Sequence, residues 1–248
     1  MSHIAPIGAE SQETGIVRIT GRHRLPSDVV SELKHVLAEN PQIVLLDLTG
    51  AAGDSHLLSA VLDPVAHYLA EWPGTAIAVA VPDPATSASL VPPTIHDRVL
   101  VAGRAEAGVE RARQMVPRDH RVTTFLRPVP QASDTARAFT RRTLRAWRLE
   151  GLIWPASLVV SELVTHSILQ TETALDLTLG RAADRVRIAV HDHGSDSLRI
   201  KQLASPTNPL EDPLHHRGLL VVRALTRSWG VFPSRDHGKT VWAVMDAD

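Results

Sequence analysis

The chain has 248 residues, 44% of them hydrophobic and 21% charged, and 26 basic side chains balance 27 acidic ones. This balance gives no electrostatic case for nucleic acid or an anionic membrane as a direct partner. The absence of cysteine excludes disulfides, thiolate catalysis and cysteine-based zinc sites. The first residues show no basic region before an apolar run, and no apolar segment approaches the roughly 20 residues of a membrane helix. We therefore expect a cytoplasmic protein, with a length that favours two domains.

The first half of the chain, residues 1–118, alternates short apolar strands with helical segments. Strands are expected at "GIVRIT", "IVLLDL", "TAIAVAV" and "DRVLV", which are β-branched or continuously apolar. Helices are expected to follow two capping pairs, Ser27-Asp28 and Asp54-Ser55, and a third helix is expected at "AEAGVERARQM". This alternation predicts a small α/β domain.

The second half, residues 119–248, begins with a strand and two helices. The strand "VTTFLRPVP" is expected to end at its prolines. Ser133 and Asp134 are then expected to cap one helix, and Pro155 stands in the first turn of the next, a position that favours proline.

The rest of the second half contains strands, a loop and one more helix. "ALDLTLG" and "RVRIAVHD" alternate with period two, as an antiparallel pair does. The proline-rich loop "PTNPLEDPLHHR" precedes a helix expected from Gly218 to about Ser228, and "KTVWAVM" is the last strand. The order predicts an α+β sandwich with its helices on one face.

A polar stripe interrupts the helix that contains "SELVTHSILQT". Glu162, His166 and Gln170 stand at i, i+4 and i+8, so they share one face of the helix. A broad apolar face is expected beside this stripe, made of Val159, Val160, Leu163, Val164 and Ile168.

Two further residues of the second half have a functional and an ordinary interpretation. Asp192 ends the apolar face of a strand, where it either meets a hydrogen-bond donor or caps the next turn. Gly218 begins a helix, where it either lets a phosphate approach the free N–H groups or is an ordinary helix start.

Four motifs in this half occur in a recognisable order: "LVVSELVT", "VHDHG", "HRGLLVVRAL…WGV" and "GKTVW". Over roughly residues 120–246 the chain thereby resembles the GHKL (histidine kinase-like) ATPases, in particular their anti-sigma-factor serine kinases. The resemblance implies a Bergerat-type α/β sandwich that binds ATP with Mg²⁺. It implies that Glu162 is a general base beside the phosphates, and that Asp192 binds the adenine amino group where Gly194 leaves room for the base.

The same resemblance implies the rest of the cofactor-binding set. Gly218 and Arg217 would meet the phosphates, and Gly238, Lys239 and Thr240 would line the pocket. Thr240 would reach the adenine through a water molecule.

Two features of the chain depart from the family pattern. His166 stands where the family has an asparagine that coordinates Mg²⁺, and imidazole is a poor ligand for that ion. "HHRG" keeps one glycine where the family commonly has Gly-x-Gly. His166 either contacts a phosphate or a softer metal, or it marks a site without magnesium-dependent catalysis.

The first half resembles the STAS domain of anti-sigma-factor antagonists, through "IVLLDLTG" followed by "GDSHL". In that family the corresponding serine is phosphorylated by the partner kinase, which implies Ser55 here. Asp54 and Ser55 suit a helix N-cap equally well.

Histidine pairs also occur, at His191 with His193 and at His215 with His216. No third ligand has a spacing that completes a site with either pair, so we do not expect a metal centre there.

Together these features predict an ATP-binding regulator that controls a sigma factor by partner switching, with serine kinase activity towards an antagonist protein or Ser55. The alternative is a catalytically degenerate scaffold that holds a sigma factor or an anti-sigma-factor antagonist, with weak or no nucleotide binding. A histidine-kinase output domain is disfavoured, because no dimerisation helix pair precedes residue 120. The oligomeric state stays open, with a homodimer as one alternative.

Overall fold

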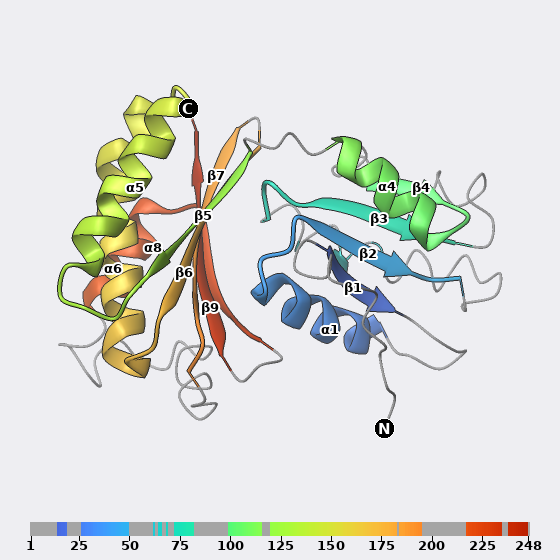
Figure 1. Ribbon diagram of the computed structural model, residues 1–248, viewed down its shortest axis with the longest axis horizontal. Helices are drawn as coiled ribbons and strands as arrows, with labels where there is room; N and C mark the ends of the chain where they lie inside the picture. Colours follow the sequence, from blue (N-terminus) through green and yellow to red (C-terminus); the bar gives the residue numbers. More distant parts are fainter. Residues whose placement is uncertain are drawn as a thin grey trace. The chain divides into compact units, whose positions relative to one another are not determined.

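The protein is a mixed α/β chain with one parallel and one antiparallel sheet (Figure 1). It forms two compact units, Met1–Ala70 with Gly74–Arg118, and Glu71–Pro73 with Asp119–Asp248. The computed structural model describes residues 14–18, 26–49, 62, 64, 65, 68, 72–81, 99–115, 120–182, 184–194, 217–234 and 238–247.

The first unit is built on a parallel sheet with helices on both faces (Figure 1). The strands occur in the order β1-β2-β3-β4, with β1 at Thr14–Arg18, β2 at Ile43–Asp47, β3 at Ala76–Ala80 and β4 at Val99–Ala102. Helix α1, Pro26–Ala38, covers one face and α4, Ala105–Met115, covers the other.

Because helices cover both faces, β2 and β3 are buried along their whole lengths, as expected of continuously apolar parallel strands. Small side chains let α4 pack closely on β3, since a Cβ at Gly108 would lie 3.2 Å from that of Ala78. The four strands expected in this half are confirmed, and so are the helices of α1 and α4. Of the helix expected after Asp54-Ser55, only Leu62, Pro64, Val65 and Tyr68 are among the described residues, and these are helical.

The second unit is built on an antiparallel sheet with helices on one face (Figure 1). The strands occur in the order β5-β6-β7-β9-β8, with β5 at Arg121–Leu126, β6 at Leu175–Ala182, β7 at Arg185–Asp192, β8 at Ser228–Pro233 and β9 at Lys239–Asp246. The helices are α5 at Ala132–Ala146, the short 3-10 helix η3 at Glu150–Leu152, α6 at Ile153–Thr171 and α8 at Arg217–Leu225.

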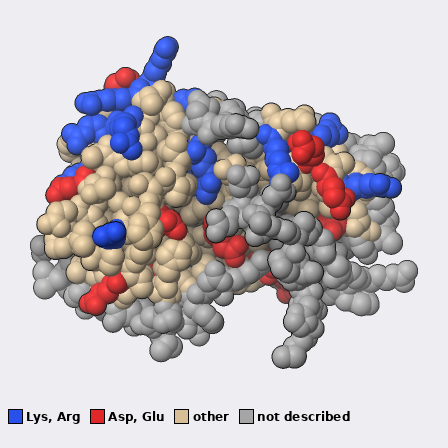
Figure 2. All heavy atoms as spheres, viewed as in Figure 1, with Lys and Arg blue, Asp and Glu red and all other residues tan. Residues whose placement is uncertain are grey.

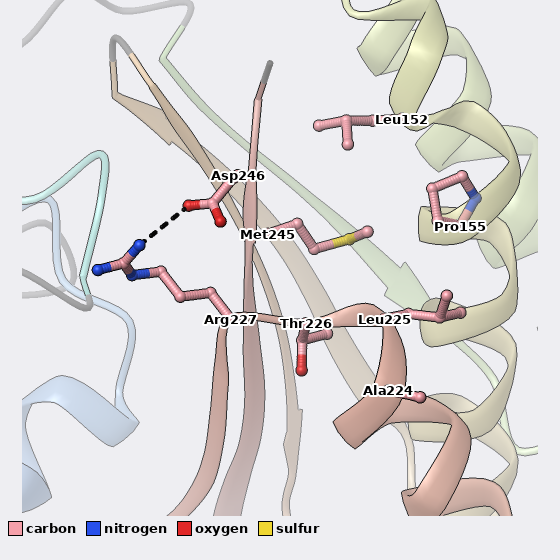
Figure 3. A pocket seen from close by; sticks show the side chains of 8 residues that line it. All are labelled: Leu152, Pro155, Ala224, Leu225, Thr226, Arg227, Met245 and Asp246. Carbon is pink, nitrogen blue, oxygen red and sulfur yellow. Dashed lines mark ion pairs between the residues drawn. The ribbon is translucent and has the colours of Figure 1, made fainter.

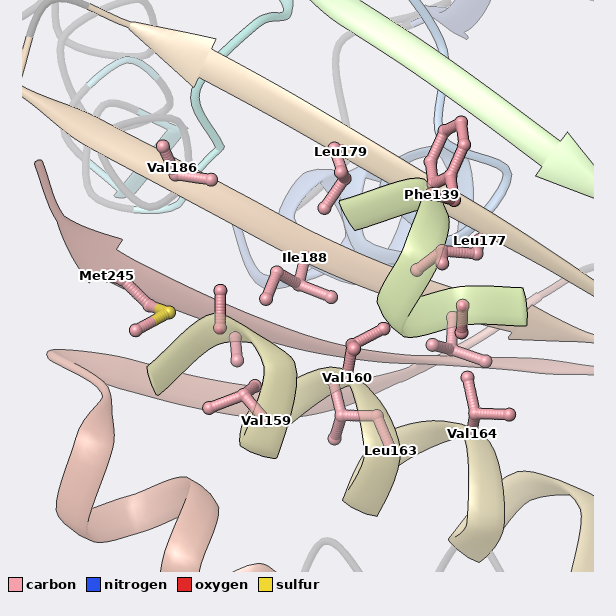
Figure 4. Packing of buried hydrophobic residues seen from close by; sticks show 14 of the residues in the cluster. Phe139, Val159, Val160, Leu163, Val164, Leu177, Leu179, Val186, Ile188 and Met245 are labelled. Carbon is pink, nitrogen blue, oxygen red and sulfur yellow. The ribbon is translucent and has the colours of Figure 1, made fainter. Parts of the chain in front are cut away.

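Helix α6 forms the centre of the second core. Its predicted apolar face is confirmed, because Val159, Val160, Leu163 and Val164 are fully buried against side chains of β6, β7 and β9 (Figure 4). The stretch Glu150–Thr171 is long and apolar enough to cross a membrane by length and composition, unlike the expectation from sequence. In this fold its apolar face packs on the sheet.

The start of α5 differs from the expectation. The helix begins at Ala132 after Gln131, which makes no side-chain capping hydrogen bond. Ser133 and Asp134 lie inside the first turn, where Ser133 hydrogen-bonds Thr165 and Asp134 pairs with Arg137. The predicted capping role is therefore wrong, because both side chains have tertiary or helical partners instead.

The end of α8 also differs from the expectation. The helix expected to reach Ser228 ends at Leu225, and Ser228–Pro233 forms β8 at the edge of the sheet beside β9. Its residues alternate as a strand does, with Trp229 and Val231 towards the core and Phe232 buried on the other face.

The face of this sheet away from the helices carries an aromatic cluster. Trp72, which belongs to the second unit, stacks on Phe232 with ring centroids 5.2 Å apart and meets Trp242 edge-on at 5.4 Å. The guanidinium of Arg187 lies 4.0 Å from the centroid of Trp72. Arg187 is fully buried, so this cation–π contact stabilises a charge that is out of water.

The core role of α6 predicts the effect of truncating its buried face. Leu163→Ala should lower the free energy of unfolding of the second unit by about 2–5 kcal/mol, because a fully buried leucine leaves a cavity. Leu169→Ala on the same helix is the control, because Leu169 is 71% exposed and its loss should change stability by less than about 0.5 kcal/mol. Urea unfolding followed by circular dichroism measures both. Equal losses in the two variants would contradict the packing described here.

Candidate functional site

The predicted polar stripe lies on the half-buried side of α6. Glu162, His166 and Gln170 are neither fully exposed nor fully buried. The helix is held at this point by Arg137 of α5, whose Nη1 donates a hydrogen bond of 2.9 Å to Ser161 Oγ. Glu162 therefore projects from a backbone that is fixed by packing on one side and by a tether on the other.

Glu162 lies against Gly218, and the position of both beside phosphates stays a prediction. A Cβ at Gly218 would lie inside 3.0 Å of the Glu162 carboxylate, so this carboxylate rests against the first turn of α8. Free N–H groups and the helix dipole make such a turn attractive to negative charge. Glycine at this position leaves room for the Glu162 carboxylate beside the start of α8.

Asp192 is paired with Lys239 on the neighbouring strand. Lys239 Nζ lies 2.7 Å from Asp192 Oδ2, and the two side chains are only 3% and 1% exposed. At this distance the Lys239 ammonium is the charge partner of Asp192 Oδ2. Asp192 Oδ1 accepts a 3.3 Å hydrogen bond from the backbone N–H of Gly194. The resemblance predicts Lys239 only as part of the pocket lining, whereas the structure places it in direct contact with Asp192.

Two glycines allow strand ends and a helix end to meet around Asp192. A Cβ at Gly194 would lie 2.6 Å from Thr171 Cγ2, at the end of α6. A Cβ at Gly238 would lie inside 3.0 Å of the backbone carbonyl oxygen of Asp192. Larger residues would push these segments apart. Glycine is therefore required at 194 and 238 by close contacts with Thr171 and with the Asp192 backbone, and not by an unusual backbone angle.

Thr240 lies on the opposite face of the sheet from this cluster. Successive residues of a strand point to opposite faces, and Lys239 is the one that faces Asp192. Thr240 Oγ1 is 3.0 Å from Nδ1 of His191, which is also on the far face. This corrects the expectation that Lys239 and Thr240 line one pocket.

The polar row of α6 consists of Glu162, His166 and Gln170. Thr171 is not part of it, because nine residues are about two and a half helical turns and put Thr171 on the side of α6 opposite to Glu162, with the buried Ser167. The Gln170 Oε1 atom is buried and accepts no hydrogen bond in the part of the chain that the structure describes. The row therefore offers a carboxylate beside a helix start at one end and a buried amide oxygen at the other.

Several predicted residues do not join this row. Ser55, His215 and His216 lie outside the described residues, and Arg217 starts α8 with a side chain that is likewise outside them. The rings of His191 and His193 meet edge-on at 4.6 Å on the far face, where His193 contacts Asp176 at 3.0 Å.

The described side chains form no cluster of metal ligands. Across the described ranges, no three side chains of histidine, aspartate or glutamate gather as metal ligands. Around His166, the neighbouring groups of the row are one carboxylate and one amide, and an imidazole at the centre does not fit the oxygen coordination of Mg²⁺.

Sequence reasoning missed Thr171 and Arg137. Thr171 packs against Gly194 because α6 ends beside β7, and Arg137 hydrogen-bonds Ser161 from another helix. Neither contact has a periodic or motif signal, since both depend on how separate elements pack.

No family model matches this sequence, and no curated protein is similar to it. The likeness to GHKL ATPases and STAS domains therefore rests on the motifs themselves.

The close approaches predict different outcomes for two glycine substitutions. Gly238→Ala should lower the free energy of unfolding by about 1–3 kcal/mol, because a backbone carbonyl must move to admit the methyl group. Gly218→Ala should be milder, with a change below about 1 kcal/mol, because only the flexible Glu162 carboxylate must turn away. Thermal unfolding of the two variants tests this order, and the reverse order would contradict the geometry.

The buried ion pair predicts a strong asymmetry between single and double substitutions. Lys239→Met leaves the Asp192 carboxylate buried without a charge partner and should cost about 3–5 kcal/mol. The double variant Asp192→Asn with Lys239→Met removes both charges and should recover much of that loss. Chemical denaturation of the two singles and the double gives the coupling energy. A double variant no more stable than Lys239→Met would show that the pair does not balance the buried carboxylate.

Proposed function

We propose that the second unit is a nucleotide-binding module of the anti-sigma-factor serine kinase kind, within a cytoplasmic regulator that controls a sigma factor by partner switching. The observation that carries this proposal is the contact of Glu162 with Gly218 at the start of α8, beside the polar row that continues along α6 through His166 and Gln170.

Two places in the second unit match the two ends of a nucleotide. The start of α8 suits phosphates, which helix N-termini bind through free N–H groups. Asp192, at the end of β7, is a carboxylate that would accept a hydrogen bond from the exocyclic amino group of adenine while it stays paired with Lys239. ATP is the cofactor that these two places would hold.

Phosphoryl transfer is the second part of the proposal. Glu162 is held beside the α8 start, where a carboxylate would take the proton from a serine hydroxyl of the target. The target would be an anti-sigma-factor antagonist or Ser55 of the same chain. His166 does not fit Mg²⁺, so no step is assigned to that ion, and the proposal ranks nucleotide binding ahead of turnover.

One observation favours a second candidate, a scaffold that holds a sigma factor or an antagonist without turnover. Lys239 already neutralises Asp192, and both side chains are buried. A ligand that takes Asp192 must realign this pair, which raises the free energy of the bound state. His166 at the position of the metal-binding asparagine favours the same candidate.

Isothermal titration with ATP and ADP, in Mg²⁺ and in EDTA, tests the proposal. Nucleotide should bind the wild type, and Asp192→Asn should weaken binding about tenfold or more, because a neutral amide replaces the charged carboxylate that accepts from the amino group. Asp184→Asn is the control, because Asp184 is exposed at the β6–β7 turn and should leave affinity unchanged.

His166→Asn separates the two candidates. A gain of Mg²⁺-dependent affinity in this variant, over a wild type that binds nucleotide without Mg²⁺, would fit a module that has changed its metal requirement. No binding by the wild type in either buffer would exclude the nucleotide proposal and leave the scaffold. Where the wild type binds ATP, intact-mass analysis of the chain and of Ser55→Ala then tests phosphorylation.

A further inference from the structure

The last two turns of α5 carry a cluster of arginines. Arg141 and Arg145 stand at i and i+4 on one face of α5, with Arg142 beside them, and Arg148 follows the end of the helix, where its backbone is left-handed with φ of 59°. We call these four arginines the arginine stripe. All four side chains are exposed, and Figure 2 shows Lys and Arg gathered at the upper left, over the end of the second unit where α5 lies in Figure 1. No acidic residue occurs between Phe139 and Leu149 to balance them.

This stripe has no partner that explains it within the described chain. Arg141, Arg145 and Arg148 make no ion pair with any residue that the structure describes. Like charges at this spacing destabilise a helix. Attraction to the negative end of the helix dipole offsets this repulsion only near the end of the helix. It therefore explains why Arg145 and Arg148 are tolerated but does not explain Arg141.

The end of α5 is held rigidly, which makes the stripe a defined surface. Arg181 of β6 donates a hydrogen bond of 3.3 Å to the backbone carbonyl of Trp147, and its guanidinium lies 5.4 Å from the centroid of that ring. Trp147 itself is buried in the core. A helix end fixed in this way needs no ordering of its backbone on binding, so only the arginine side chains lose freedom.

The chain then turns through η3 and exposes a tryptophan. Trp154, in the first turn of α6, is 68% exposed, whereas the other tryptophans that the structure describes are buried or half-buried. Tryptophan and arginine are the side chains most often found as energetic anchors in protein interfaces. Trp154 is only six residues from Arg148.

A pocket opens beside this corner. Leu152 and Pro155, on either side of Trp154 in the chain, line a cavity of about 340 Å³ together with Leu225 and Met245 (Figure 3). In Figure 3 these apolar side chains converge on one space. The rim is formed by Arg227 and Asp246, which are half exposed and pair at 3.5 Å. The pocket shares no residue with the row that begins at Glu162.

We propose that this corner, made of the α5 arginine stripe, Trp154 and the Leu152–Met245 pocket, is the docking site for an acidic segment of a partner protein. One large apolar side chain of the segment enters the pocket beside Trp154. Neighbouring aspartates or glutamates pair with Arg145 and Arg148, because guanidinium groups bind carboxylates through two parallel hydrogen bonds. The inference rests on the proposed function only in that the partner of this regulator is a protein.

The chemistry of the corner favours a protein over a nucleic acid. An apolar pocket matches a hydrophobic side chain, and phosphates would have no use for it.

A peptide selection on the full-length protein tests the proposal. The bait is the wild-type chain and the probe is a random linear peptide library. Enriched peptides should carry a large apolar residue within a turn of two or more acidic residues. Binding of such a peptide should shift the fluorescence of Trp154 to the blue, and the shift should be lost in Trp154→Phe.

Charge reversal identifies the arginines. Affinity for the selected peptides should fall about tenfold or more in the double variant Arg145→Glu with Arg148→Glu. The matched control is Arg104→Glu with Arg111→Glu, two exposed arginines of the first unit, which changes the net charge equally and should leave affinity unchanged. The Arg145/Arg148 variant should bind nucleotide as the wild type does, so a failure of the nucleotide proposal is seen separately.

Four outcomes would overturn the inference. One is that the enriched peptides lack acidic residues. A second is equal peptide affinity in the wild type and the Arg145/Arg148 variant, with only a lower melting temperature, which would leave these arginines a helix-dipole role. A third is displacement of the peptides by a single-stranded oligonucleotide, which would point to nucleic acid. A fourth is concentration-dependent self-association that the same variant abolishes, which would make a second copy of the chain the occupant.

Discussion

The second unit depends on one constraint: helix α6 must face the sheet with its apolar side and the rest of the molecule with its polar side. Val159, Val160, Leu163 and Val164 settle the rotation of the helix, because moving any of them out of the core exposes apolar surface. That rotation aims Glu162 at the start of α8 and brings Thr171 to the ends of β7 and β9. The core and the candidate site are therefore consequences of the same packing.

The Asp192–Lys239 pair stabilises the unliganded protein, and a ligand that uses Asp192 must compete with that pair. In the unliganded protein the carboxylate is buried, and Lys239 at 2.7 Å keeps that burial tolerable. A base that accepts or donates at Asp192 gains from a carboxylate already out of water, but it must tolerate the lysine beside it. The Asp192–Lys239 pair thus decides which ligands bind here, and a ligand complementary to both charges would bind most tightly.

Sequence periodicity predicted the strands and helices that bury a continuous or alternating apolar face. It failed where the outcome depends on one residue of register. Thr240 matched a motif, yet strand alternation places Lys239 against Asp192 instead. The edge strand β8 was missed because its six residues contain Gly230, whose lack of a side chain makes room for the Trp242 ring. Contacts of this kind follow from tertiary packing and have no local pattern.

Helix α6 also connects the two functional proposals. Trp154 is in the first turn of α6, and the polar row ends at Gln170, one residue before Thr171 at the end of the helix. The docking corner and the polar row therefore lie towards opposite ends of α6. A well-packed helix moves as a body more readily than it bends, because its core contacts have few alternative arrangements. Partner switching would then require two positions of α6 or α8, each favoured by one ligand, and the coupling would be reciprocal. A nucleotide that changes peptide affinity must be bound more tightly, by the same factor, in the presence of that peptide.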